Sequence, residues 1–122
     1  MRIDEVSEKS GLTPDTIRFY EKSDMLPAIA RDQRGWRQFA PDDLEWLIVL
    51  ARLRATGMPL KAVREFAASA QSAESETSTE QRKRLDLLRS HAETLSQRRA
   101  ELEACEDYLN FKISTYTSKL GL

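Results

Sequence analysis

The sequence predicts a mainly α-helical chain, with a small winged helix-turn-helix head followed by one long helix. Three observations carry this prediction. A strongly capped short helix follows a glycine turn near residue 11. A glycine-centred, arginine-rich stretch lies within 31–39, and leucines recur every seven residues after position 85. The first two patterns are typical of a winged helix-turn-helix, and the third is typical of a coiled coil.

These patterns divide the 122 residues into four parts. The stretch around 69–81 is small and polar, which indicates a linker or loosely held hinge. The predicted parts are the head 1–70, the linker 71–81, the dimerisation helix 82–117 and a short tail 118–122.

Composition limits the classes of protein that the chain could represent. Charged residues make up 32% and the formal net charge is −1, so overall basicity does not indicate nucleic-acid binding and only local clusters could. No apolar run reaches the ~18 residues of a membrane span, and no signal segment opens the chain. Cys105 is the single cysteine, which rules out an internal disulfide. We therefore expect a cytoplasmic protein without membrane contact.

The first predicted helix covers residues 5–10 and packs through Val6, with Ile3 and Leu12 on the same core side. Asp4 is the expected N-cap of this helix. Gly11 stands where a left-handed C-terminal cap is needed, because glycine adopts that conformation without steric cost.

The second helix is the centre of the head. Thr13 is expected to cap its free N–H groups and Pro14 to occupy its first position. Ile17 is the core anchor, which leaves Arg18 and Phe19 for other surfaces. A capped N-terminus with an adjacent arginine suits phosphate binding, although a short capped helix is also common in helical domains that bind nothing.

Residues 23–40 lose helical periodicity, and Gly35 lies at the centre of their arginine-rich part. Two short strands around this glycine would form a β-hairpin, with Trp36 on one face and Arg37 on the other. Such a hairpin, with Arg31 and Arg34 also on it, suits a wing along a phosphate backbone. The alternative is an ordinary solvated loop whose aromatic side chains pack on the core.

Two more helices complete the head. Pro41 opens the longer one, whose apolar face consists of Leu44, Leu47, Ile48, Ala51 and Ala55. Gly57 ends it, and a shorter helix follows with inward residues at 60, 63 and 66.

The last segment has a heptad pattern. Its d row is apolar throughout and consists of Leu88, Leu95, Leu102, Leu109 and Tyr116. Its a row is polar in the middle and consists of Leu85, Ala92, Arg99, Glu106 and Ile113. We expect the apolar members of both rows to form a homodimer interface, because the head is too small to cover a ~35-residue helix of ~50 Å. The alternative is a helix that folds back on its own head.

The charged a positions favour an antiparallel pair. In an antiparallel dimer centred between Arg99 and Glu106, each side chain could face the opposite charge of the partner. In a parallel dimer, like charges would meet.

Three motifs together resemble the MerR family of bacterial transcription regulators. They are G-L-T-P-D-T-I-R-F-Y-E-K, R-x-x-R-G-W-R-x-F and L-R-A-T-G-M-P-L-K-A-V, and they cover residues 1 to about 70. The resemblance implies a winged-helix DNA-binding domain, an antiparallel coiled-coil homodimer and a palindromic double-stranded promoter with an overlong spacer. It further implies activation, or repression, by twisting and bending that spacer for RNA polymerase.

The resemblance also implies which residues lie at the DNA. The residues expected at the major groove and its phosphates are Thr13, Arg18, Phe19 and Tyr20. The residues expected on the wing are Arg31, Arg34, Trp36 and Arg37. Lys61 is expected to reach a phosphate from the second helix-turn-helix.

The sequence departs from the family pattern at several positions. Asp24 and Met25 replace the usual Gly-Leu, but Asp tolerates a left-handed turn. Trp36 and Phe39 stand where tyrosines are usual, and Phe39 lacks the tyrosine hydroxyl. Metal-sensing relatives carry several cysteines, whereas Cys105 and the sole histidine, His91, are too few for a metal site. We therefore expect no metal and no cofactor. Cys105 as a redox sensor is kept as an alternative to a small packing residue.

Two other functional classes are weaker. A DNA-architectural or excisionase-like protein would share the winged head without realigning a promoter. The other class is an interaction protein or enzyme that makes no DNA contact. An enzyme is not expected, because the sequence has no nucleophile–base pair, phosphate-binding glycine loop or ligand cluster. The inducing stimulus and the target genes are not readable from the residues.

Overall fold

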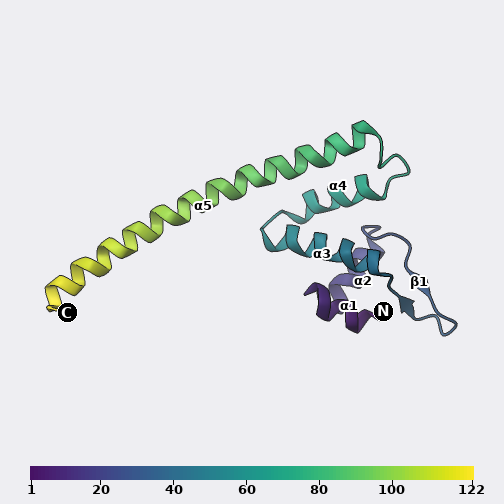
Figure 1. Ribbon diagram of the computed structural model, residues 1–122, viewed down its shortest axis with the longest axis horizontal. Helices are drawn as coiled ribbons and strands as arrows, with labels where there is room; N and C mark the ends of the chain where they lie inside the picture. The colour runs from purple at the N-terminus through teal and green to yellow at the C-terminus, as the bar shows by residue number, and fades with distance from the viewer. The chain divides into compact units, whose positions relative to one another are not determined.

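A computed structural model describes all residues, 1–122, and confirms a mainly helical fold with one small hairpin (Figure 1). The elements in chain order are α1 (Ile3–Ser10), α2 (Pro14–Lys22), β1 (Ala30–Arg31), β2 (Arg37–Gln38), α3 (Pro41–Ala55), α4 (Leu60–Gln71) and α5 (Ser78–Leu120). They form two compact units, Met1–Leu87 and Leu88–Leu122. None of the helices is both long and apolar enough to cross a membrane.

The turn between α1 and α2 forms as the sequence predicts. Gly11 has φ 79° and its N–H donates to the carbonyl of Ser7 at 3.0 Å, which closes the end of α1. Thr13 accepts the N–H of Thr16 at 3.1 Å and caps α2, and Pro14 occupies the first helical position. The predicted cap of α1 is wrong. Helix α1 begins at Ile3, so Asp4 lies inside its first turn and Arg2 holds the N-cap position without a side-chain cap.

The wing is a two-stranded antiparallel hairpin. Ala30 pairs with Gln38, and Arg31 pairs with Arg37. Gly35 has φ 80°, a left-handed conformation that lets the connecting turn close. Upstream, Asp24 has φ 58°, so the left-handed turn expected after α2 is kept without a glycine.

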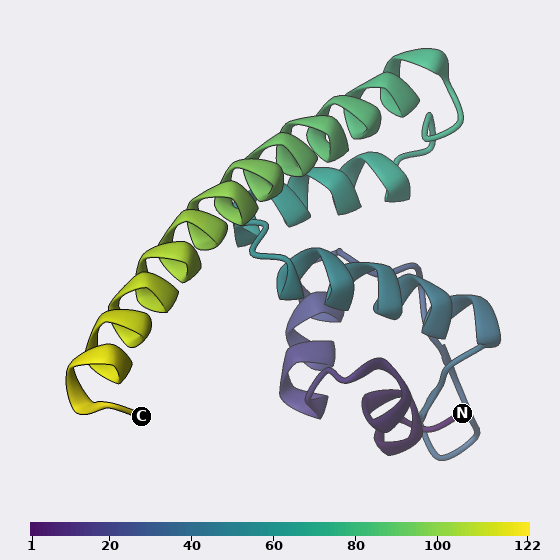
Figure 2. The same cartoon turned by 60° about the vertical axis from the view of Figure 1, so that its left-hand side comes forward.

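The core of the head joins all four of its short helices. Its fully buried side chains include Val6, Ile17, Leu47, Leu50 and Val63. Figure 2 shows α3 lying across α1 and α2.

Aromatic residues extend the core toward the wing and α4. The Trp46 indole donates to the carbonyl of Met25 at 2.7 Å and stacks on Phe66, with ring centroids 5.9 Å apart. Phe39, which stands in place of a tyrosine, is only 3% exposed and serves as a core side chain.

The structure differs from the sequence prediction between α4 and α5. The connection between the two helices is shorter than the predicted linker 71–81, because α4 continues to Gln71 and α5 already begins at Ser78. Thr77 accepts the N–H of Glu80 at 3.3 Å, which satisfies a free donor in the first turn of α5. Helix α5 then continues to Leu120, three residues beyond the predicted end at 117.

The heptad side chains of α5 are exposed along the whole helix. Residues with exposed fractions from 38% to 69% are Leu85, Leu88, Leu95, Leu102, Leu109, Ile113 and Tyr116. Ala92 is exposed as well, and α5 has no buried residue. A continuous apolar stripe on a solvated helix is unfavourable unless another surface covers it.

Candidate nucleic-acid interface

Helix α2 divides its residues between the core and solvent. Ile17 and Tyr20 point inward, with 0% and 3% of their surface exposed. Arg18 and Phe19 lie on the outer side, and Arg18 pairs with Asp15 at 3.0 Å across a turn of the helix. This pair is exposed, so it holds the guanidinium only weakly and leaves it available to another anion.

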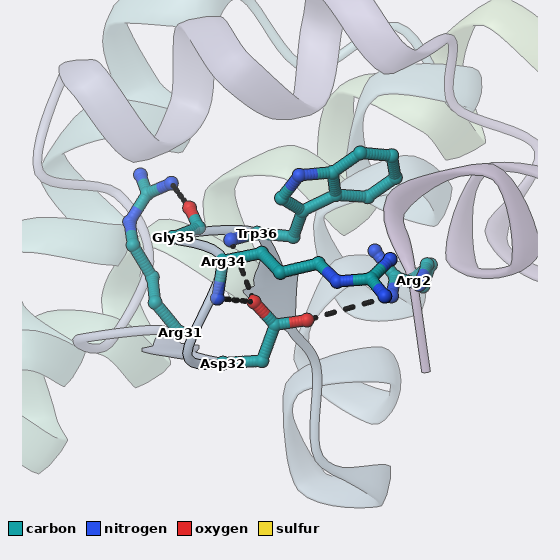
Figure 3. A network of polar contacts seen from close by, with 6 residues as sticks. All are labelled: Arg2, Arg31, Asp32, Arg34, Gly35 and Trp36. Carbon is teal, nitrogen blue, oxygen red and sulfur yellow. Dashed lines mark hydrogen bonds and ion pairs between the residues drawn. The ribbon is translucent and has the colours of Figure 1, made fainter.

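Asp32 organises the turn of the wing, as Figure 3 shows. One carboxylate oxygen accepts the backbone N–H groups of Arg34 and Trp36, at 2.8 Å and 3.0 Å. The other accepts Arg2 at 3.4 Å. The hydrogen bond from the Trp36 N–H is the main cause that lowers the pKa of Asp32, against a smaller opposing effect of burial.

Arg2 joins the wing although it lies thirty residues away in sequence. Its guanidinium carbon lies 4.3 Å from the centroid of the Trp36 ring, while Trp36 itself remains 56% exposed (Figure 3). Its Nη1 atom is buried and has no hydrogen-bond partner. Arg2 is not among the predicted contact residues, because an isolated arginine at the start of the chain belongs to no motif.

Glu21 connects the last turn of α2 to both strands of the wing. Its Oε1 accepts Arg37 Nε at 2.8 Å and lies 3.5 Å from an Nη of Arg31. Arg31 also donates to the carbonyl of Gly35 at 2.9 Å. Glu21 and Arg37 are about three-quarters buried, whereas the Arg31 side chain is 48% exposed.

These elements enclose one groove. The groove measures about 380 Å³ and its lining includes four arginines, which come from the start of α1, from α2 and from both wing strands. They are Arg2, Arg18, Arg31 and Arg37. Asp4 is the only acidic residue of the lining, but each of the four arginines also pairs with a carboxylate beside the groove, namely Asp15, Asp32 or Glu21. A groove with four guanidinium groups suits an extended polyanion that can take the place of the weaker of these partners.

The structure brings most of the predicted DNA-contact residues to the surface. Arg34 and Lys61 are exposed and their side chains have no hydrogen-bond or ion-pair partner. Tyr20 is the exception. Tyr20 is only 3% exposed and its ring packs in the core, so a DNA contact could come only from its hydroxyl and stays a prediction.

Arg64 is a further cation that the motifs do not indicate. It lies on α4 with its guanidinium carbon 5.3 Å from the centroid of the Phe19 ring. It also donates to the hydroxyl of Ser23 at 3.3 Å. Through these contacts α4 reaches the outer side of α2, a relation that only the fold reveals.

The structure gives no ligand cluster in the head or on α5. No group of three or more histidine, cysteine or acidic side chains could hold a metal ion. Cys105 lies exposed on α5.

The capped helix, the wing and the arginine groove define a winged helix-turn-helix protein, and comparisons with known proteins identify its family. The profile of the MerR HTH family of regulatory proteins matches residues 1–70, and the profile described as "MerR, DNA binding" matches residues 44–110. The chain therefore belongs to the MerR family and is a DNA-binding transcriptional regulator.

Individual relatives extend this similarity along the whole chain. An HTH-type transcriptional regulator of Haemophilus influenzae is 35% identical over 116 residues, which are 95% of this chain and 83% of that protein. Among solved structures, HiNmlR, a MerR family regulator lacking the sensor domain and bound to promoter DNA, has a TM-score of 0.81 and 32% identity. That match covers 99% of this chain and 90% of HiNmlR. A MerR family regulator from Bacillus thuringiensis has a TM-score of 0.74 at 25% identity, over 94% and 97% of the two chains.

Proposed function

We propose that two copies of this chain bind a palindromic promoter in the bacterial cytoplasm and regulate transcription by twisting and bending an overlong spacer. RNA polymerase is the proposed partner at the realigned promoter. HiNmlR, which was crystallised with promoter DNA, supports the choice of ligand because the similarity covers nearly all of this chain. No catalytic activity is proposed.

The observation that carries the proposal is the groove lined by Arg2, Arg18, Arg31 and Arg37. Arginines contributed by α1, α2 and the wing converge there, although the chain as a whole has a net charge of −1. A guanidinium offers a planar donor fork to phosphate oxygens, and contacts of this kind set the register of a protein on a duplex. In this arrangement Arg18 and Phe19 lie toward the major groove, and Trp36 and Arg34 lie along the adjacent backbone.

Helix α5 supplies the second part of the proposal. The stripe from Leu85 to Tyr116 is apolar and exposed, and the proposed occupant is the same stripe of a second copy. A two-fold dimer matches a palindromic site, because each head then meets one half-site. Arg99, an a position of the heptad pattern, is exposed and pairs with Glu103 at 3.4 Å within its own helix.

Deformation of the spacer follows from the position of the protein–phosphate contacts at the two ends of the site. Contacts to phosphates hold the two ends of the site and carry no base information. Two heads fixed at the ends of one rigid dimer would therefore impose their separation on the DNA between them. Sequence-dependent stiffness of the spacer would then contribute to selectivity.

The test is a footprint combined with transcription in vitro. DNA from upstream of the chain's own reading frame and its neighbours is footprinted with the purified protein, and transcripts are measured with RNA polymerase on the same fragments. The proposal expects protection of two half-sites that flank an overlong spacer, and a change in transcript level that vanishes when the spacer is shortened to ordinary length. Protection without any effect on transcription would instead identify the architectural class of protein.

A further inference from the structure

Glu21 is the one carboxylate that contacts both strands of the wing. It extends from the last turn of α2, and its Oε1 atom is shared by Arg37 and Arg31, which are themselves cross-strand partners. One acceptor therefore connects the helix proposed for the major groove to the hairpin proposed for the backbone. Any change at this atom alters the orientation of the wing and the charge of the groove together.

The two arginines are held unequally. The Arg37 Nε lies 2.8 Å from Glu21, and both side chains are largely buried, which favours a strong charge-assisted hydrogen bond. The Arg31 contact is 3.5 Å, and 48% of the Arg31 side chain is exposed. Exposed ion pairs of that length contribute little, so the Arg31–Glu21 pair is the one that another anion breaks most easily. Arg31 also donates to the Gly35 carbonyl at 2.9 Å, but through its other terminal nitrogen, Nη1.

We propose that Glu21 is a positioning residue that occupies the place of a phosphate in the free protein. On DNA binding, Arg31 exchanges Glu21 for a backbone phosphate, whereas Arg37 stays on Glu21 and fixes the angle between the wing and α2. The exchange involves no covalent change and needs only rotation of the Arg31 side chain away from Glu21, which also strains or breaks its hydrogen bond to the Gly35 carbonyl. This inference rests on the proposed function and revises its residue roles, because Arg37 becomes a brace for the wing while Arg31 makes the contact.

Removing the charge of Glu21 should change the salt dependence of DNA binding. The negative charge of Glu21 offsets part of the charge of the groove. Removing that charge frees Arg37 to meet DNA, so the affinity for DNA of any sequence should rise at low salt. At the same time the wing loses its orientation, so the preference for the operator should fall.

The test measures binding of the full chain to two fluorescein-labelled duplexes over a series of KCl concentrations. One duplex carries the footprinted operator, and the other is a scrambled duplex of the same composition. With Glu21→Gln, the slope of log affinity against log salt should steepen by up to ~0.9, the value for one extra phosphate contact. The ratio of operator to scrambled affinity should fall about fivefold, within the range of coupling between contacting residues.

Two single variants separate the roles of the arginines. Arg31→Ala should reduce the magnitude of the slope by ~0.9, whereas Arg37→Ala should lower the operator affinity and leave the slope unchanged. Glu45→Gln is the matched control, because Glu45 is an exposed carboxylate on α3 without an ion pair. It removes the same charge and should leave the affinity ratio unchanged.

Each outcome decides the proposal. If wild-type protein shows no salt-dependent binding to either duplex, the proposed function fails. If wild type binds but Glu21→Gln keeps the wild-type slope and ratio, or flattens the slope, the positioning role of Glu21 is wrong.

Circular dichroism checks that the Glu21→Gln variant is folded. If it is not, Glu21→Asp keeps the charge but withdraws the carboxylate, and should retain the slope while losing operator preference. A wild-type ratio in that variant would also contradict the proposal.

Discussion

The guanidinium of Arg84 donates a hydrogen bond of 3.0 Å to the hydroxyl of Ser69, across the turn that connects α4 to α5. It also donates to the carbonyl of Ser75 at 2.8 Å, and the Ser69 hydroxyl in turn donates to the carbonyl of Glu80 at 3.2 Å. Ser69 is only 2% exposed. A segment that the composition predicts as a loose hinge is thus held by one arginine from the following helix.

Replacing Arg84 by alanine should loosen this turn. The loss of hydrogen bonds to a charged donor, with a buried hydroxyl left partly unsatisfied, should destabilise the head by about 1–3 kcal/mol. Hydrogen exchange should show faster amide exchange over residues 72–77, and the thermal midpoint should fall. Arg82→Ala is the control, because Arg82 is exposed and has no ion pair. Equal exchange rates in the two variants would show that the hydrogen bonds of Arg84 do not stabilise the turn.

The cap of α2 is the next test. Thr13→Ala removes the acceptor for the Thr16 N–H and should cost about 1 kcal/mol, as is usual for the loss of an N-cap. Urea denaturation measures this free energy of unfolding. Thr13→Ser keeps the hydroxyl and should restore most of the stability. A similar loss in both variants would argue that the methyl group of Thr13, and not its hydroxyl, stabilises the helix.

Arg18 tests the major-groove assignment. Its partner in the free protein, Asp15, is 95% exposed, so DNA should displace it at little cost. Arg18→Ala should weaken binding and reduce the salt slope by ~0.9. Asp15→Ala should leave that slope almost unchanged or steepen it slightly. An unchanged slope in Arg18→Ala would remove Arg18 from the phosphate contacts.

Local rules predicted the parts of the fold that depend on few residues. The cap at Thr13, the left-handed turns at Gly11 and Asp24, and the hairpin around Gly35 all follow from the conformations that these residue types prefer. The apolar stripe of α5 follows from its period. In each case the determining residues lie within a few positions of one another.

Features that depend on distant contacts were missed or misplaced. Arg2 and Arg64 reach Trp36 and Phe19 only because the fold brings separate helices to the wing and to α2. The core packing of the Tyr20 ring was not predicted either, although Tyr20 lies one helical turn after Ile17 and so on the same side of α2. The predicted linker was too long because small polar residues also form helix ends, and the Arg84 contacts that order the turn come from the next helix.

Asp32 predicts a pH dependence of the wing. The pKa of its carboxyl is lowered from the ordinary value of 3.8, chiefly by the Trp36 N–H and further by the Arg34 N–H and Arg2. A lowered folded-state pKa means that the stabilisation is fully present above 3.8 and is lost as the pH falls through the lower folded value. The wing should therefore stay ordered at neutral pH and loosen only in more strongly acidic solution.

Nuclear magnetic resonance can follow this titration at the donors themselves. The amide resonances of Arg34 and Trp36 should shift together on acidification below pH 3.8, and Asp32→Asn should abolish that shift. Asn keeps one acceptor oxygen, so the turn should persist while its pH dependence disappears. A shift centred near neutral pH would show that another group controls the turn.

The orientation of the α5 pair gives the last prediction. An antiparallel dimer centred between Arg99 and Glu106 places position 88 of one copy beside position 116 of the other. A parallel dimer separates these positions by 28 residues, about 42 Å at 1.5 Å per residue. Both native side chains, Leu88 and Tyr116, are exposed in the single chain, so cysteines introduced there would be accessible to a reagent.

The experiment uses a Cys105→Ser background and three proteins. One carries Leu88→Cys, the second carries Tyr116→Cys, and the third carries both substitutions. A short bismaleimide should crosslink the double variant, and peptide mapping should find the 88-to-116 product between chains. The two single variants, treated alone, should give little dimer product. Efficient 88-to-88 crosslinks without any 88-to-116 product would instead establish a parallel pair, and with it a different spacing of the two heads on DNA.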